Sequence, residues 1–242
     1  LLLESVAVAD AIMLGSVEQN SMSAVSLATQ IQFIQNMFLA AVTSGVSILG
    51  AQYWGKGDKE TMNDIFCLAL RLAGTVSILT FVACSFFPGL LMRIFTNDPA
   101  VISEGMKYLR IVAFSYVLMG ITQVYLFIMR SVERVVVATV VYLVSLICNV
   151  ILNAIFIFGL LGCPAMGIQG AALAARFVEL ILVFGYARLF NKDIKFRFRY
   201  LMRTDKLLVR DFLRYALPVV MNEVMWGLGT AANTAILGHM GS

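Results

Sequence analysis

Residues 135–159 read VVVATVVYLVSLICNVILNAIFIFG, a run of 25 residues without one charged side chain. Roughly 20 apolar helical residues cross a bilayer core of about 30 Å, so this run predicts a transmembrane helix. The uncharged run continues to Ala175, which is too long for one span. Glycines and a proline between Gly159 and Gly167 divide it in two.

Other long uncharged stretches lie on both sides of this run. With the charged segments between them, they predict an all-α fold, a polytopic transmembrane helix bundle. The expected spans are 1–17, 23–50, 65–88, 107–129, 135–159, 167–190 and 212–238.

The composition is that of a protein surrounded by lipid. Of the 242 residues, 60% are hydrophobic and 13% charged, whereas soluble domains carry about a quarter charged residues. The formal net charge is +4, and the basic residues crowd into one late segment. This is typical of a cytoplasmic loop near anionic lipid and not of a nucleic-acid surface. The cysteines lack metal-ligand spacing and are expected to be reduced packing residues: Cys67, Cys84, Cys148 and Cys163.

The basic residues also orient the chain. Fourteen Lys and Arg fall on one side of the predicted membrane, and three fall on the other: Arg93, Lys107 and Arg110. Cytoplasmic loops carry an excess of Lys and Arg, so the first side is cytoplasmic. We therefore expect an integral protein of the plasma (bacterial cytoplasmic) membrane, with the 191–210 loop in the cytoplasm. The fourteen are Lys56, Lys59, Arg71, Arg130, Arg134, Arg188, Lys192, Lys195, Arg197, Arg199, Arg203, Lys206, Arg210 and Arg214.

Residues 191–210 predict a basic linker between two bundles. Residues 1–190 would form a six-helix lobe with a truncated first helix, and residues 211–242 would begin a second lobe. The stretch ADAIMLG at 9–15 aligns with ANTAILG at 232–238, at an offset of 223 residues. Because that offset spans six helices, the two halves would have parallel topology. We expect the remaining helices of the second lobe to be missing partners from the same chain.

Polar residues inside the predicted spans are candidates for function, because ionisable groups at membrane depth are costly. Asp10 lies near the outer end of the first span, and Asn149 and Asn153 share one face of the fifth at a similar depth. A carboxylate with two amide oxygens suits a hard cation such as Na⁺. A desolvated Asp10 would instead carry a proton, and the asparagines would otherwise serve as packing contacts between helices.

Further polar groups suggest a cavity for substrate. Glu223 with Trp226 one turn beyond suits an organic cation, through charge and cation–π attraction. Gln32, Gln35 and Asn36 share a face, where they would line a cavity or bond to neighbouring helices. Arg176 and Glu179, at i and i+3, fit a self-neutralising pair, and Glu179 is also a cavity candidate.

The sequence offers no set of catalytic residues. His239 has no nucleophile nearby, and we find no phosphate-binding glycine loop and no His/Cys metal cluster. We expect neither an enzyme nor a bound cofactor.

The ordered set of motifs resembles the multidrug and toxic compound extrusion (MATE) family. The first helix ends in DAIMLG at 10–15, like the family's Asp-Thr-x-Met-x-Gly. The second ends in AQYWGKGD at 51–58, like Ala-Gln-x-x-Gly-Ala-Gly-Asp. The fifth carries NVILN at 149–153, the sixth opens with GIQGAALA at 167–174, and Leu217-Pro218 opens the seventh. The resemblance covers nearly the whole chain.

The resemblance implies two six-helix lobes and antiport of small organic cations for Na⁺ or H⁺ by alternating access. It places coupling at Asp10, Asn149 and Asn153. The family often has Thr where this chain has Ala175, which removes one possible oxygen ligand. Some bacterial members have a glutamate at the level of Trp226, one turn beyond Glu223, so that role is not carried over directly.

Two other functions stay open. A lipid-linked oligosaccharide or polysaccharide flippase of the same superfamily would need several basic residues in its cavity, where this sequence places only Arg176 deeply. A non-transporting membrane scaffold would tolerate replacement of Asp10 and its Asn neighbours.

Overall fold

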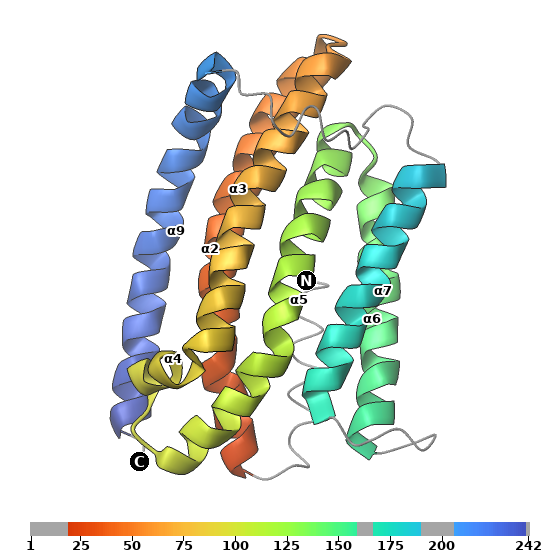
Figure 1. Ribbon diagram of the computed structural model, residues 1–242. Helices are drawn as coiled ribbons and strands as arrows, with labels where there is room; N and C mark the ends of the chain where they lie inside the picture. Colours follow the sequence, from red (N-terminus) through yellow and green to blue (C-terminus); the bar gives the residue numbers. More distant parts are fainter. Residues whose placement is uncertain (1–18, 159–166, 190–205, 241–242) are drawn as a thin grey trace.

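The computed structural model describes residues 19–158, 167–189 and 206–240, and within these ranges every regular element is a helix. Figure 1 shows the long helices standing side by side, while the short α4 lies across one end of the bundle. The helices are α2 (Gln19–Gly55), α3 (Lys59–Phe86), α4 (Pro88–Phe95), α5 (Pro99–Ser131), α6 (Val135–Phe158), α7 (Gly167–Leu189) and α9 (Lys206–Met240).

The predicted all-α class is confirmed, and each predicted span inside the described ranges overlaps a helix, although the span at 65–88 runs past the end of α3 at Phe86 into α4. The helices are longer than the spans at several ends, because polar caps extend beyond the apolar runs. The span predicted at 107–129 belongs to a helix that begins at Pro99, after Asp98 accepts a hydrogen bond from the Ala100 amide at 2.8 Å. The first predicted span, 1–17, lies outside the described residues.

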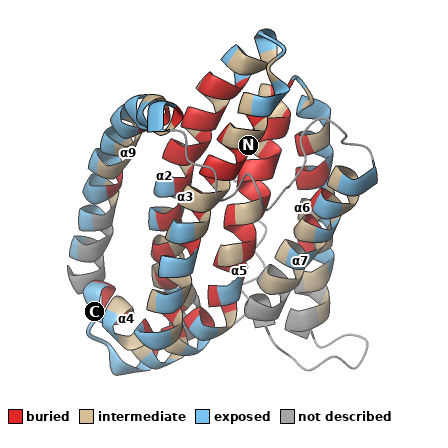
Figure 2. Ribbon diagram, turned by 45° about the horizontal axis from the view of Figure 1, so that its top comes forward, coloured by how far each residue is buried: buried red, intermediate tan, exposed pale blue. Residues whose placement is uncertain are grey.

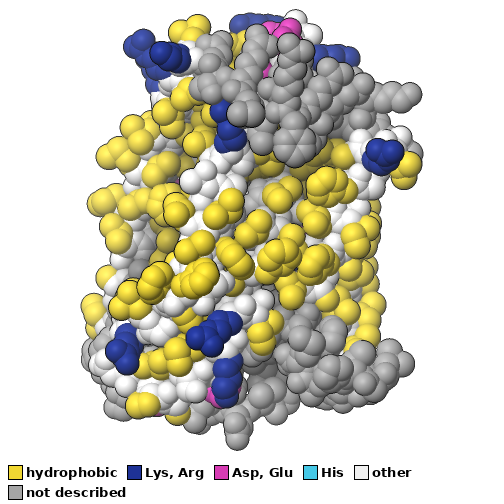
Figure 3. All heavy atoms as spheres, in the orientation of Figure 1, with side chains coloured by type: hydrophobic (Ala, Val, Ile, Leu, Met, Phe, Trp, Pro, Cys, Tyr) yellow, Lys and Arg dark blue, Asp and Glu magenta, His cyan; other side chains and the backbone are white. Residues whose placement is uncertain are grey.

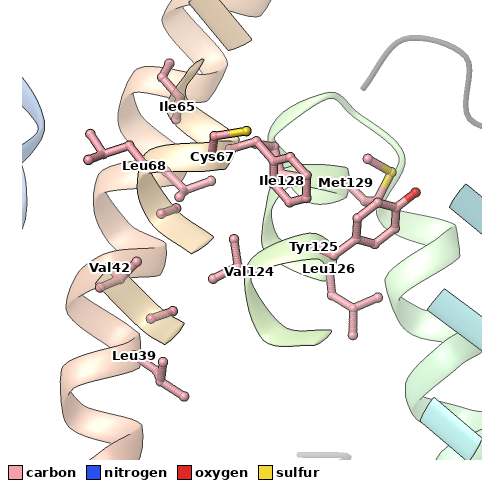
Figure 4. Close-up of a cluster of buried hydrophobic side chains, with 14 of the residues drawn as sticks. Leu39, Val42, Ile65, Cys67, Leu68, Val124, Tyr125, Leu126, Ile128 and Met129 are labelled. Carbon is pink, nitrogen blue, oxygen red and sulfur yellow. The ribbon is translucent and has the colours of Figure 1, made fainter. Parts of the chain in front are cut away.

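Helix α5 is the centre of the bundle. It packs against α2, α3 and α7 and also touches α4 and α6, while α6 pairs with α7 and α9 lies along α2. Burial follows this arrangement, since the buried residues concentrate on α5 and on the faces turned toward it (Figure 2). The main apolar cluster joins α2, α3 and α5 through side chains such as Val42, Ile65 and Ile128 (Figure 4).

The outer surface of the bundle is apolar as well. On α6, one stripe of residues spaced by three or four is exposed, whereas the opposite face carries the buried Ala138, Val141 and Tyr142. A helix that is hydrophobic all round is expected where lipid replaces water. Figure 3 shows hydrophobic side chains over the middle of one face, with Lys and Arg gathered toward the two ends. The stripe consists of Val136, Val140, Leu143, Ile147 and Ile151.

Within the described residues, four helices are long and apolar enough to cross a membrane. They are Ser23–Gly55, Lys59–Phe86, Pro99–Ser131 and Val135–Leu152. These four agree with predicted spans, and the full count of seven stays a prediction.

The motif at 51–58 has a local structural reason. Helix α2 ends at Gly55, and Gly57 adopts φ 73°, a left-handed conformation that favours glycine. Asp58 then caps α3: its carboxylate accepts bonds from the Thr61 amide at 3.0 Å and the Thr61 hydroxyl at 2.6 Å. These bonds, the one from the hydroxyl first, hold the pKa of Asp58 below its usual value. The motif is therefore a tight turn between two long helices.

Candidate functional site

The predicted cation-binding residues are only partly within the described structure. Asp10 lies outside the described residues, and so does the side chain of Asn153, although its backbone belongs to α6. Asn149 is 6% exposed, so its amide is buried inside the bundle. Helices α6 and α7, the fifth and sixth predicted spans, pack against each other. Coordination shared among Asp10, Asn149 and Asn153 stays a prediction.

The three polar residues of α2 have different surroundings. Gln35 is buried, and its amide nitrogen donates to Ser77 Oγ at 3.0 Å and to the Tyr116 carbonyl at 2.9 Å. It thus ties α2 to α3 and α5. Gln32 is half-buried and points its amide at Met119 Sδ, 3.8 Å away, whereas Asn36 is exposed. Gln35 and Gln32 thus both donate to neighbouring helices, and the lining of a cavity by Gln32, Gln35 and Asn36 stays a prediction.

Arg176 and Glu179 form the ion pair that their spacing predicts. A guanidinium nitrogen of Arg176 donates to Glu179 Oε2 at 2.6 Å. The Glu179 side chain is 1% exposed and that of Arg176 is 22% exposed. Glu179 Oε1 is also buried and accepts no hydrogen bond from any described residue. The pair is therefore asymmetric, with a sealed carboxylate and a partly accessible guanidinium.

A second buried polar contact lies beside this pair and was not predicted. The Tyr142 hydroxyl on α6 donates to Gln123 Oε1 on α5 at 2.8 Å. Both charges of the Arg176–Glu179 pair act electrostatically on the Tyr142 hydroxyl. Ser145, one turn along α6 from Tyr142, has a buried hydroxyl without a partner among the described residues. Tyr, Gln and Ser within apolar runs give only a weak sequence signal, because they occur equally in ordinary packing.

Helix geometry puts the Tyr142–Gln123 contact and Glu179 at similar depths, nearer to one end of the bundle than Asn149. A short turn joins α5 to α6 and marks one end of the bundle. At 1.5 Å per residue, Tyr142 and Gln123 lie about 10–12 Å from that end. Glu179 lies about 15 Å from the residue that ends α7 on the same side, while Asn149 lies about 21 Å from the start of α6. The contact between Tyr142 and Gln123 is thus about two turns of α6 from Asn149.

On α9, Trp226 and Glu223 stand beside α2. The Trp226 ring packs on Phe33 with centroids 5.7 Å apart and remains 61% exposed. Glu223 is half-buried. Together with Gln32 and Asn36, they give the α2–α9 pair several polar or aromatic side chains that stay accessible.

The described residues contain no group of three or more His, Cys, Asp or Glu side chains able to hold a metal ion. Cys67, Cys84 and Cys148 are free thiols, as expected, and Cys163 lies outside the described residues.

Known protein families and sequences include clear relatives of this chain. The model of the MatE family matches residues 1–155. The chain is 24% identical over 228 residues to the probable multidrug resistance protein YoeA of Bacillus subtilis, covering 92% of this chain and 49% of YoeA. It is 26% identical over 188 residues to the multidrug resistance protein NorM of Photobacterium profundum, covering 77% of this chain and 41% of NorM.

Among solved structures, a ligand complex of the MATE multidrug transporter DinF-BH superposes with a TM-score of 0.86 at 20% identity. The superposition covers 99% of this chain and 54% of that one. The chain thus spans about half the length of the curated relatives that it matches along most of its own length.

Proposed function

Because the chain belongs to the MatE family, we propose that the full-length protein is a secondary active antiporter and not an enzyme. It exports small organic cations in exchange for Na⁺ or H⁺ by alternating access. The observation that carries this proposal is the family match over residues 1–155. Relatives named as multidrug resistance proteins support it.

In this proposal, residues 1–190 form the first lobe, 191–210 a cytoplasmic basic linker, and 211–242 the first helix of the second lobe. The packing of α9 along α2 supports a contact between the lobes at this place. The protein would sit in a bacterial cytoplasmic membrane, in contact with lipid through surfaces such as the exposed stripe of α6.

Asp10, Asn149 and Asn153 are proposed to bind the coupling ion. The burial of Asn149 supports this role, since it places an amide, a ligand type that hard cations accept, away from bulk solvent. Four residues are proposed to contact the organic cation, two on α9 and two on α2. The accessible Trp226 ring beside the half-buried carboxyl of Glu223 offers cation–π attraction together with charge. The four are Glu223, Trp226, Gln32 and Asn36.

A flippase that holds pyrophosphate is less well supported. Such a function requires free cationic side chains in the cavity, whereas Arg176 is already engaged by Glu179. For this reason we propose export of cations and not of lipid-linked phosphates.

The test is efflux of a fluorescent organic cation from proteoliposomes that contain the full-length protein, under separate Na⁺ and H⁺ gradients. Asp10→Asn should insert and fold normally, because a neutral side chain costs less to bury than a carboxylate. Its transport should collapse, since Asn offers no charge to a cation and no site to a proton. Antiport at the wild-type rate by a well-folded Asp10→Asn protein would refute the assignment.

Asp98→Asn is the matched control. Asp98 caps α5 outside the apolar part of the bundle, and Asn caps helices about as well as Asp. The same chemical change there should leave transport intact. Ion binding measured without substrate then separates loss of coupling from loss of substrate affinity.

A further inference from the structure

We propose that Glu179 is a second proton-binding group of this bundle, with Arg176 as its internal counter-ion. Protonation of Glu179 would free the positive charge of Arg176 and so lower the affinity of the lobe for an organic cation. This role rests on the proposed function, and it makes H⁺ one ion that competes with the substrate.

The ion pair is buried asymmetrically. Glu179 is 1% exposed, and its Oε1 has no hydrogen-bond partner among the described residues. One contact with Arg176, at 2.6 Å, therefore compensates the carboxylate charge. The Arg176 side chain is 22% exposed and has a long flexible stem, so it is the partner able to move away.

Movement of Arg176 would leave the Glu179 carboxylate without a counter-ion. A buried carboxylate in that state is strongly disfavoured and becomes neutral by taking up a proton. The two states differ by one H⁺, added as an O–H bond on the Glu179 carboxyl. The ion pair has net charge zero, and the protonated state has net charge +1, carried by the guanidinium.

Among the described residues, the groups found around the pair supply no negative charge to balance this change. In the described part of the chain, Tyr142 from α6 interacts electrostatically with both members of the pair, and Tyr116 from α5 interacts with Arg176; Arg130 from α5 interacts in turn with Tyr142. The Arg130 guanidinium lies 5.3 Å from the centre of the Tyr142 ring. None of these three groups supplies a negative charge at neutral pH. A change of one charge at Glu179 is therefore not offset by these neighbours.

Competition between a proton and an organic cation is the expected consequence. A bound cation favours the state with net charge zero, whereas a proton on Glu179 produces a state that repels the cation. For two unit charges about 10 Å apart in a medium of effective dielectric constant about 20, repulsion weakens binding by about tenfold.

The direct test needs no substrate. Infrared difference spectra of the full-length protein are recorded between about pH 9 and pH 5, a range that lies above the titration of solvent-exposed carboxyls. The background is Asp10→Asn, so that Asp10 contributes no signal. We expect a carboxylic C=O band of a buried acid to appear on acidification and to be absent from Glu179→Gln. Identical difference spectra with and without Glu179→Gln would overturn the proposal.

The control is Glu104→Gln. Glu104 forms an ion pair of the same i, i+3 spacing with Lys107 at 2.7 Å, but both side chains are exposed, by 38% and 65%. This variant should keep the band of the buried acid. Loss of the band in Glu104→Gln would show that it does not report on Glu179.

A second measurement follows binding of a fluorescent organic cation over the same pH range, again in the Asp10→Asn background so that Asp10 adds no pH dependence. Glu179→Gln imitates the protonated state, so it should bind about tenfold more weakly than its parent at pH 9 and show no pH dependence. The double variant Arg176→Gln/Glu179→Gln removes both charges, leaves no unpaired buried ion, and should bind tightly without pH dependence. If either variant kept the pH response of the Asp10→Asn parent, the proposal would be overturned.

The two measurements also separate the proton site from the proposed function. A Glu179-dependent band in a protein that binds and exports no organic cation would sink the proposed function and leave the proton site standing. Efflux of cations with no Glu179-dependent band would refute the proton site and leave the proposed function standing.

Discussion

The close contact between α3 and α5 allows a quantitative test of the packing. A Cβ atom added at Gly120 would overlap Ser77 Oγ and would lie 3.1 Å from Ser77 Cβ and 3.4 Å from the Ala73 carbonyl oxygen. Gly120→Ala should therefore force the two helices apart or rotate Ser77. Overpacking of this kind costs about 1–3 kcal/mol, and the higher helix propensity of alanine returns at most about 1 kcal/mol. We expect a net loss of about 1–2 kcal/mol.

Removing the obstructing oxygen should relieve most of this loss. Ser77→Ala alone breaks the bond from Gln35, which in a membrane protein is worth about 0.6 kcal/mol. In the Ser77→Ala background, Gly120→Ala meets only the tight contacts at 3.1 and 3.4 Å. The double variant should thus be more stable than Gly120→Ala, with a favourable coupling energy of about 1 kcal/mol.

The assay is reversible unfolding of the full-length protein in mixed micelles, by titration with a denaturing detergent. Gly74→Ala on α3 is the control, because an added Cβ there has no neighbour within 4 Å. It should be neutral or stabilising. If Gly120→Ala were as stable as the wild type, or equally damaging with and without the Ser77 hydroxyl, the described contact between α3 and α5 would be wrong.

Three other parts of the chain are open to similar tests. Asp58→Ala should cost about 1 kcal/mol at neutral pH by uncapping α3. Because bonds from Thr61 lower the folded-state pKa of Asp58, its stabilisation is present above the unfolded value of 3.8 and is lost as pH falls through the folded value. Unfolding titrations in the variant should therefore lack this acid-induced loss. Tyr142→Phe, which removes the bond to Gln123, should cost about 0.6 kcal/mol in the same assay. Phe198→Cys in a cysteine-free protein should resist labelling from outside intact cells, and labelling there would reverse the proposed orientation.

Much of the fold could be predicted because the bilayer imposes a simple length rule. Uncharged runs gave the positions of α2, α3, α5 and α6 without any knowledge of tertiary contacts. The length rule does not predict helix α4, since its eight residues are too few to span a bilayer. Pro88 explains the break: it cannot continue α3, but it fits the first turn of a new helix.

The site could be predicted only where the decisive contact lies within one helix. The i, i+3 spacing of Arg176 and Glu179 sufficed for their pairing. The bond between Tyr142 and Gln123 depends on how α5 and α6 face each other, which no local pattern encodes.

The polar face of α2 illustrates the same limit. Gln32, Gln35 and Asn36 lie within about 100° of arc around the axis of α2. Gln35 nevertheless donates to α3 and α5, whereas the next residue, Asn36, is exposed. A helical period predicts that residues share a face but not where the neighbouring helix ends. For that reason the sequence left cavity lining and interhelical bonding as equal alternatives.

The two polar contacts inside the bundle differ in how far packing alone explains them. Gln35 donates to both Ser77 and Tyr116, so its hydrogen bonds join three helices and packing alone explains it. Arg176 and Glu179 are neighbours on a single helix, so their bond joins no two helices together. A buried ion pair is on average no more stable than apolar residues of similar size. Stability therefore gives no reason for placing both charges there, whereas the proton site proposed at Glu179 gives one.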